Sequence, residues 1–266
     1  MALPRKDLEH YWPDRIEERT ERNAKLTLQE TEKLLAEIYE DQGLQIENEI
    51  LKVLSKIQEQ PQEVIPNDYY RNDRYWKLWD YVRDKLNILG KKQLKIMNPA
   101  LAKVYEDTQR IVAEEVPPEI IKSSFLVPSA IDATQVIHQV WCLDGKEFSD
   151  RIWDDKAKLL NSLKKNLSTY LVQGKSNFYI AEQIQKEMGT SQYNAYRIAR
   201  TETAHLQIKA KTDKYQEMGF TKGEYVGTKC CDICKEKNGK IYTLKELESM
   251  IPVHPHCTCT FTLVVD

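Results

Sequence analysis

Five of the six cysteines in this 266-residue chain lie in one short stretch near its C-terminus, between Cys230 and Cys259. A chain of this length can bury an apolar core without disulfides, so the cysteines need another explanation. The start of the chain, MALPRKDLEHYW, has no apolar signal core, and no run approaches the roughly 18 apolar residues of a membrane span. We therefore expect a cytoplasmic site of synthesis, where thiols stay reduced and clustered cysteines favour a metal site.

The cysteines and histidines form two groups with the spacing of a zinc knuckle. Two residues separate Cys231 from Cys234, and a turn follows in which Gly239 supplies a conformation that other residues resist. The second group is HPHCTC, residues 254–259. Together they can supply a tetrahedral site. The preferred ligands are Cys231, Cys234, His254 and Cys257, with Cys259 as the main alternate fourth ligand and Cys230 and His256 as weaker ones.

A structural Zn²⁺ is the cofactor that this pattern favours. A module of about 45 residues buries little apolar surface, whereas structural zinc can contribute on the order of 10 kcal/mol to folding. Redox use of Cys-x-x-Cys is the main alternative, but that motif usually opens a helix after a strand, and here a glycine turn follows. A catalytic zinc needs an open coordination position, which five or six potential ligands disfavour. We predict no catalytic residue.

Composition and periodicity predict a mainly α fold. Charged residues make up 30% of the chain, its mean hydropathy is −0.61, and glycine and proline are sparse. Between Asp14 and Gln60 apolar residues recur at helical spacing, and Gln42-Gly43 is expected to break or bend the run. Two interpretations stay open for this segment: a helical hairpin packed on itself, or an elongated arm whose apolar seam docks on another chain.

Later signals predict further helices in the first 145 residues. An aromatic stripe with Trp76, Trp79, Leu86 and Leu89 marks a core-facing helix that ends at Gly90. Asn98-Pro99 is typical of a helix start, Pro117-Pro118 of a stop, and a shorter helix is predicted from Pro128 to Trp141.

Two smaller regions follow. Residues 146–219 are predicted to form three helices, from Ser149 to Gly174, from Ser176 to Gly189, and from Thr190 or Ser191 to Gly219. Residues 220–266 are predicted to form a β-rich zinc-knuckle module, with strands near 223–227, 240–243 and 260–265 and a short helix after the capping box Thr243 to Glu246. The expected domains are therefore 1–145, 146–219 and 220–266.

One further group of polar residues lies on the sequence RIARTETAH, which holds Arg197, Arg200, Glu202 and His205. Glu202 and His205 are three residues apart, so on a helix they share a face and can bind a metal or act as an acid–base pair. Ordinary helical pairing produces the same pattern, and we prefer that interpretation. No phosphate-binding loop, nucleophile elbow or dinucleotide fingerprint is present.

Several motifs in a fixed order resemble one known family. They are DRIWDD at 150–155, GKSNFYIAEQI at 174–184, RIARTETAH at 197–205, CDIC followed by NGKIY at 231–242, and HPHCTC at 254–259. This order is similar to the C-terminal domain of phage head morphogenesis proteins, the Mu F-like minor head proteins, over roughly residues 145–263. Two departures are Thr258, where the family commonly has arginine, and His256, where it often has asparagine.

The resemblance implies a non-enzymatic minor capsid protein inside the phage head. It implies association with the portal protein, contacts with scaffold and major capsid protein, and a role in procapsid assembly and in DNA packaging or ejection. The expected location is the virion interior, after assembly in the host cytoplasm.

Two other functions stay open. One is weak, non-specific binding of double-stranded DNA, because residues 151–266 carry 18 Lys and Arg against 13 Asp and Glu. The other is a zinc-containing hydrolase or toxin-related enzyme that uses Glu202 and His205.

Overall fold

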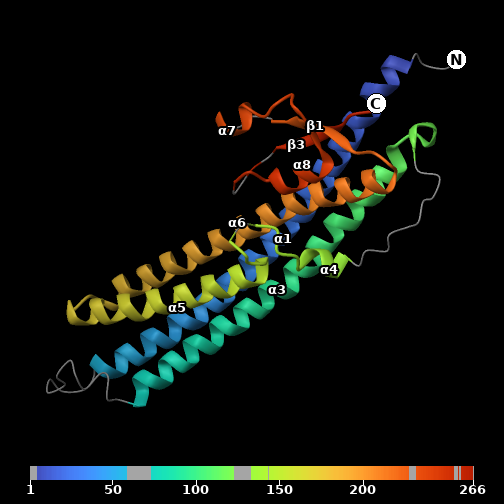
Figure 1. Ribbon diagram of the computed structural model, residues 1–266. Coiled ribbons are helices and arrows are strands. Elements are labelled where there is room, and N and C mark those ends of the chain that lie inside the picture. The colour runs from blue at the N-terminus through green and yellow to red at the C-terminus, as the bar shows by residue number, and fades with distance from the viewer. Residues whose placement is uncertain are drawn as a thin grey trace. The chain divides into compact units, whose positions relative to one another are not determined.

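The computed structural model describes residues 5–58, 73–122, 133–142, 144–227, 232–254, 257 and 259–265. It is mainly helical, as composition and periodicity predict (Figure 1). The helices are α1 (Arg5–Gln58), α3 (Asp73–Glu115), the 3₁₀ turn η1 (Pro118–Ile120), α4 (Ala133–Ile137), α5 (Phe148–Val172), α6 (Asn177–Glu217), α7 (Asp232–Lys235) and α8 (Leu244–Met250). The strands are β1 (Lys222–Val226), β2 (Ile241–Thr243) and β3 (Thr260–Leu263).

The chain divides into two compact units that alternate along the sequence. Unit 1 comprises Met1–Thr31, Met97–Glu147 and Arg197–Asp266, and unit 2 comprises Glu32–Ile96 and Phe148–Tyr196. The three consecutive domains expected from the sequence stay a prediction.

The first long helix does not fold back on itself. Residues 14–58 lie within the single helix α1, so the hairpin interpretation is wrong. Gly43 lies inside this helix, where a glycine costs only about 0.5–1 kcal/mol relative to alanine. Burial of Leu35, Tyr39 and Ile46 on either side of it outweighs that cost. Docking of this segment on another chain stays a prediction.

The second long helix also passes through two predicted boundaries. Helix α3 continues through Gly90 and Pro99, so neither the predicted end nor the predicted start is present. Gly90 is required by packing, because a Cβ there would lie 2.6 Å from Cζ3 of Trp153. The aromatic stripe is correct for the buried Trp79 but wrong for Trp76, which is 59% exposed.

The region predicted as three helices contains two. Ser176 caps α6 as expected, since its Oγ accepts a hydrogen bond from the Tyr179 amide at 3.2 Å. The helix then continues through Gly189 to Glu217. Ser191 does not cap a new helix, because it is buried and its hydroxyl donates to Asp155 on α5. Of the short helix predicted for 128–141, only Ala133–Ile137 is helical among the described residues.

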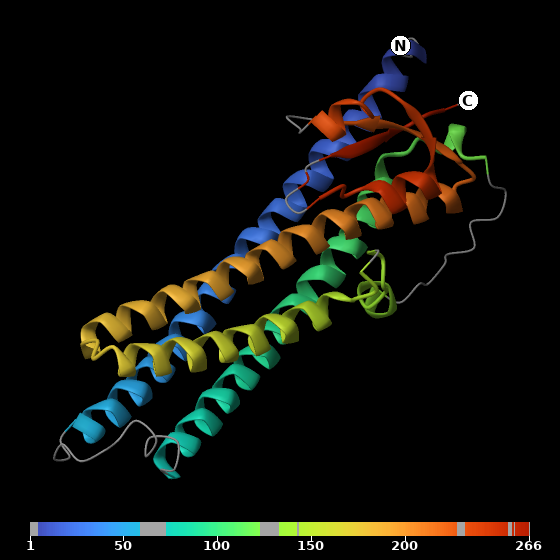
Figure 2. The same cartoon turned by 60° about the vertical axis from the view of Figure 1, so that its left-hand side comes forward.

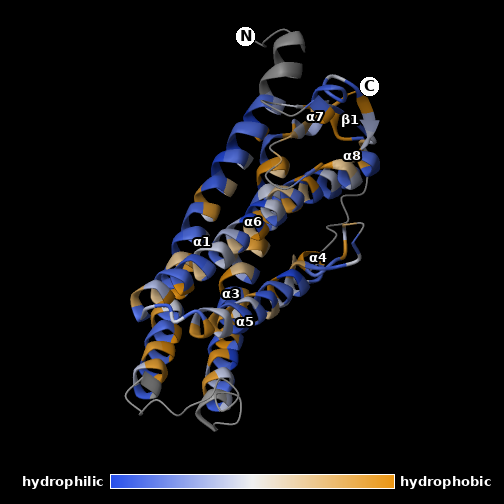
Figure 3. Cartoon of the chain, turned by 90° about the vertical axis from the view of Figure 1, so that its left-hand side faces the viewer, coloured by the Kyte–Doolittle hydropathy of each residue, from blue (hydrophilic) through white to orange (hydrophobic). Residues whose placement is uncertain are grey.

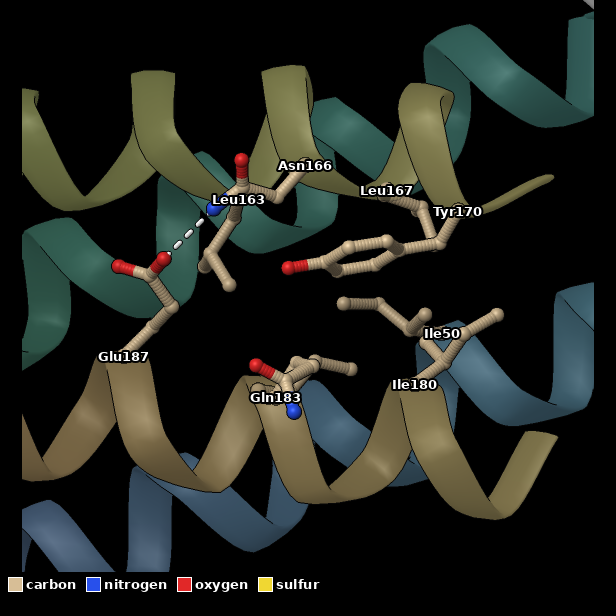
Figure 4. Close-up of a pocket in the computed structure, with 9 residues that line it drawn as sticks. Ile50, Leu163, Asn166, Leu167, Tyr170, Ile180, Gln183 and Glu187 are labelled. Carbon is tan, nitrogen blue, oxygen red and sulfur yellow. Dashed lines mark hydrogen bonds between the residues drawn. The ribbon is translucent and has the colours of Figure 1, made fainter. Parts of the chain in front are cut away.

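Unit 2 is built from four helical segments that lie side by side, one each from α1, α3, α5 and α6 (Figures 1 and 2). Hydrophobic and hydrophilic residues alternate along these helices (Figure 3). Ile50, Leu163 and Ile180 enclose a small apolar cavity, beside which Asn166 donates a hydrogen bond of 2.6 Å to Glu187 (Figure 4).

A buried polar layer crosses the same unit. The Lys156 ammonium donates to the hydroxyls of Tyr39 and Ser191 and pairs with Asp155 at 3.0 Å. Asn194 completes the layer by donating to Asp155 at 2.7 Å. Residues from α1, α5 and α6 therefore satisfy one another, which favours a single register of these helices.

Unit 1 contains the sheet, in the order β2-β1-β3 with both pairings antiparallel. The three strands lie within one residue of each predicted start, and the sheet packs beside α8 and the C-terminal part of α6 (Figures 1 and 2). Its core joins residues of α1, α3, α6, the sheet and the cysteine region: Trp12, Ile16, Val112, Ile208, Tyr215, Tyr225, Leu247, Cys257 and Phe261.

Candidate metal centre

Local sequence signals position the two halves of the cysteine region. The first half is the one-turn helix α7, followed by a turn in which Gly239 has φ +76°. The Gly239 amide donates to the Tyr225 carbonyl at 2.9 Å, which ties the turn to β1. The predicted capping box of α8 is present, with Thr243 and Glu246 bonded to each other's backbone amides. These hydrogen bonds fix the conformation of both turns between the halves.

The two halves bring three metal-ligating side chains together. The donor atoms of Cys234, His254 and Cys257 all lie within 4.8 Å of one another. The Cys234 Sγ is 3.7 Å from the His254 Nε2. In a tetrahedral zinc site with ordinary bond lengths, a sulfur and a nitrogen ligand are about 3.6 Å apart. This cluster can therefore hold a metal ion without rearrangement of that pair.

The surroundings of the thiols also fit a metal. Burial raises the pKa of Cys257, but hydrogen bonds from the backbone of Cys259 and Val253 outweigh it, so the pKa falls below its ordinary value. The Tyr225 hydroxyl lies buried, and the thiols of Cys234 and Cys259 are the side-chain groups beside it. A metal-bound thiolate can accept a hydrogen bond from this hydroxyl, which a neutral thiol does poorly.

The other predicted ligands are not part of this cluster in the described part of the chain. Cys231, Cys230 and His256 lie outside the described residues. Cys259 is buried but is not among the three donor atoms that lie mutually close in the described part of the chain. Burial raises its pKa, as expected for a thiol in apolar surroundings. A fourth ligand for the cluster stays a prediction.

A buried ion pair connects this region to the helices of unit 1. Lys211 of α6 pairs with Glu17 of α1 and donates to the Thr260 hydroxyl at 2.9 Å. The Thr260 hydroxyl in turn donates to Glu17 at 3.1 Å. Because Thr260 directly follows Cys259, the cysteine region is attached to both helices through one side-chain network.

The polar motif on α6 separates into an exposed half and a buried half. Arg197 and Arg200 are exposed, whereas Glu202 and His205 are 3% and 5% exposed. Trp141 covers the buried pair: its indole N–H donates to Glu202 at 2.9 Å, and its ring stacks on His205 with 4.2 Å between centroids. Burial lowers the pKa of His205 to about 3, with a smaller contribution from Lys209.

Sequence reasoning missed several residues that shape these sites. The sequence marks Trp141 only as the end of a short helix, and it assigns Lys211, Glu17 and Thr260 no part in a site. No local pattern marks them, because their partners lie far away in the sequence: about 60 residues separate Trp141 from Glu202, and more than 190 separate Lys211 from Glu17.

Comparison with known proteins identifies the C-terminal part of the chain. Residues 161–262 match the family model described as phage Mu protein F like protein. These residues form a phage Mu F-like region. The match covers less than half of the chain, and it contains both α6 and the cysteine region. No curated protein and no solved structure matches the chain.

The Mu F-like region confirms the resemblance drawn from the motifs. The family indicates a phage head morphogenesis protein. Among the described helices, none is long and apolar enough to cross a bilayer.

Proposed function

We propose that this protein is a minor head protein that lies inside the phage head, associates with the portal, and assists procapsid assembly and DNA packaging or ejection. The Mu F-like match over residues 161–262 is the observation that carries this proposal. The fold is compatible with an assembly role, because its long helices offer extended surfaces and its C-terminal module is tied to them by a buried ion pair. Scaffold and major capsid protein are further expected partners.

We also propose that the cysteine region holds a structural Zn²⁺. Cys234, His254 and Cys257 supply three ligands, and Cys231, which precedes α7, supplies the fourth, with Cys259 as the alternate. Two or three thiolates with an imidazole are typical of a closed, non-catalytic site. The ion would hold the ends of a small sheet that has little apolar core of its own.

The environment of Glu202 and His205 supports a non-enzymatic role for this motif. Both side chains are buried, and the Trp141 ring covers them, so a substrate has no access to either. A hydrolytic base needs contact with water or substrate. The pair therefore supports the proposal that the motif serves packing.

The proposal about the head is tested with purified particles. A phage that lacks this gene is complemented with the wild-type gene, and procapsids and virions are analysed by quantitative mass spectrometry. We expect the protein in both particles in few copies, and we expect it to co-purify with the portal protein when the two are produced together. Absence from procapsids and virions would overturn the proposal.

The zinc proposal is tested by metal analysis of the full chain. We expect about one zinc ion per chain in the wild-type protein and none in Cys234→Ser. Cys142→Ser is the matched control, because Cys142 lies outside the mutually close donors. Full metal loss in the control, or no metal in the wild type after purification without chelators, contradicts the site.

A further inference from the structure

The surface between α1 and α6 in unit 2 contains a groove that internal packing does not explain. Its volume is about 400 Å³. One wall is formed by α1, with Ala36, Glu40, Gly43, Leu44 and Glu47, and the other by α6, with Gln185, Met188, Gly189 and Gln192. Tyr39 of the buried polar layer also lines the groove. All of its lining residues belong to unit 2, and none belongs to the metal centre.

Two glycines in this groove lie in the middle of helices, and packing within unit 2 does not require a glycine at either position. Gly189 has open space where a Cβ would be, and Gly43 would make only ordinary contacts of 3.6 Å with Met188. Neither has a positive φ. Glycine inside a helix destabilises it relative to alanine. Gly90 in the same unit differs, because Trp153 fills the space that its side chain would need.

The remaining groove residues indicate what it can bind. Among the apolar residues that line it, Leu44 is 51% exposed and Met188 is 6% exposed. Glu40 has no ion-pair partner among the described residues, and Glu47 accepts a hydrogen bond only from neutral Gln185, at 3.1 Å. The groove therefore combines close backbone access and apolar residues with two carboxylates that no described cation neutralises.

These features fit an α-helix of another protein better than a second copy of this chain. Helices approach closely where small residues line the contact. Glu40 and Glu47 are seven residues apart, or about 10.5 Å along α1, so a partner helix with Lys or Arg at positions seven apart can pair with both. Two copies that met symmetrically through this groove would instead oppose glutamate to glutamate, which is unfavourable.

We propose that the α1–α6 groove of unit 2 is a docking site for a basic, amphipathic helix of another head protein. The groove and its preference for a basic helix follow from the geometry and charge. That the helix belongs to a head protein rests on the proposed function. The glycines allow the close approach, Leu44 and Met188 supply the apolar contact, and Glu40 and Glu47 select the sequence of the partner.

The first test asks whether the glycines serve the fold. Gly43→Ala and Gly189→Ala are each expected to raise the melting temperature, by about 2 °C, because alanine favours the helix and meets no clash. Gly90→Ala is the matched control and is expected to lower it. If the two groove variants lower the melting temperature as Gly90→Ala does, the glycines are needed for folding and the proposal fails.

The second test identifies the occupant in assembled particles. A photo-crosslinking residue replaces Leu44 in the full chain, and another replaces the exposed Arg83 of α3 as a control. After irradiation of purified procapsids, crosslinked peptides are sequenced by mass spectrometry. We expect position 44, and not position 83, to give crosslinks to one helical segment of another head protein with Lys or Arg seven residues apart.

Groove variants then distinguish docking from mere proximity. Gly189→Leu, which fills the groove, and the double change Glu40→Lys with Glu47→Lys are each expected to reduce the crosslink roughly tenfold. Changing the two basic residues of the partner to glutamate should restore the crosslink yield in the variant with Glu40→Lys and Glu47→Lys. Crosslinks to a second copy of this chain, or a yield that Gly189→Leu leaves unchanged, would overturn the proposal.

The two proposals fail in different ways. If the protein is absent from procapsids, the proposed function is wrong. If it is present at wild-type level but position 44 gives no crosslink, the groove is not a docking site and the proposed function stands.

Discussion

At the level of single residues, the most informative pair is His205 and Trp141. The imidazole is 5% exposed, stacks on the indole, and has no hydrogen-bond partner for its Nδ1 in the described part of the chain. Such a side chain is held neutral, and protonation inside the fold is costly. These contacts support the proposal that the motif serves packing, and such a role would give a dependence of stability on pH.

We predict that stability falls with acidification because of this histidine. Its folded pKa is about 3, below the ordinary 6.5, so the unfolded chain binds the proton first. The contribution of neutral His205 to the free energy of unfolding is complete above pH 6.5. It is lost as the pH falls toward 3, at up to about 1.4 kcal/mol per pH unit. Denaturant unfolding from pH 7 to about pH 4 should show a loss on the order of 3 kcal/mol from this group.

His205→Phe is the variant that isolates the effect. Phenylalanine keeps an aromatic ring against Trp141 and cannot be protonated. The free energy of unfolding should therefore depend on pH less steeply, by the equivalent of one bound proton. Acid release of a metal affects both proteins and cancels in the comparison. Parallel pH profiles for wild type and variant would show that another group is responsible.

Sequence reasoning reaches furthest where the structure is local. The structure brings Cys234, His254 and Cys257 together, and the turns that carry them have their own sequence signals in Gly239 and the Thr243 capping box; their role as metal ligands stays a prediction. The role of Trp141 could not be predicted, because nothing in its neighbourhood indicates a partner on α6.

At the level of secondary-structure elements, packing decided where the helices end. Gly90, Pro99 and Gly189 were interpreted as boundaries, yet all three lie inside continuous helices. A glycine costs a helix about 1 kcal/mol, and burial of one large apolar side chain outweighs that. The strands were predicted more accurately, because Gly219 and Gly239, with φ of +86° and +76°, bound them with conformations that only local sequence sets.

The connection between helices and sheet predicts a specific loss of stability. Lys211→Met removes the ammonium that pairs with Glu17 and donates to Thr260, and it leaves a partly buried carboxylate uncompensated. We expect a cost of about 2–3 kcal/mol in urea unfolding. Lys52→Met, which breaks the exposed pair with Glu49 on α1, should cost at most about 0.5 kcal/mol.

A second change separates the ion pair from the packing of the lysine stem. In the double variant Lys211→Met with Glu17→Gln, no charge remains unpaired, so part of the lost stability should return. Strictly additive costs for the two changes would mean that Lys211 acts through its aliphatic stem against Phe261 and not through Glu17.

At the level of the whole molecule, the metal donors are confined to one of the two units. The sequence of unit 2 contains neither cysteine nor histidine, and its helical segments have their own apolar core and polar layer. In unit 1, Cys234 and Cys257 belong to the same core as Trp12 and Ile16 of α1. If the cysteine region holds a metal, as its spacing predicts, the two units should therefore respond unequally to metal removal.

Removal of the metal should unfold part of the molecule and leave the rest folded. With a strong chelator, we expect amide hydrogen exchange in 222–226 and 260–263 to accelerate on the order of 100-fold or more, because bound metal supplies much of the folding free energy of a small module. The first turns of α1 should lose protection to a smaller degree, through Ile16 and Glu17. Segment 153–172 of unit 2 should keep its protection, and added Zn²⁺ should reverse the change. Uniform loss of protection across both units, or none in the strands, would contradict a metal that organises the sheet of unit 1.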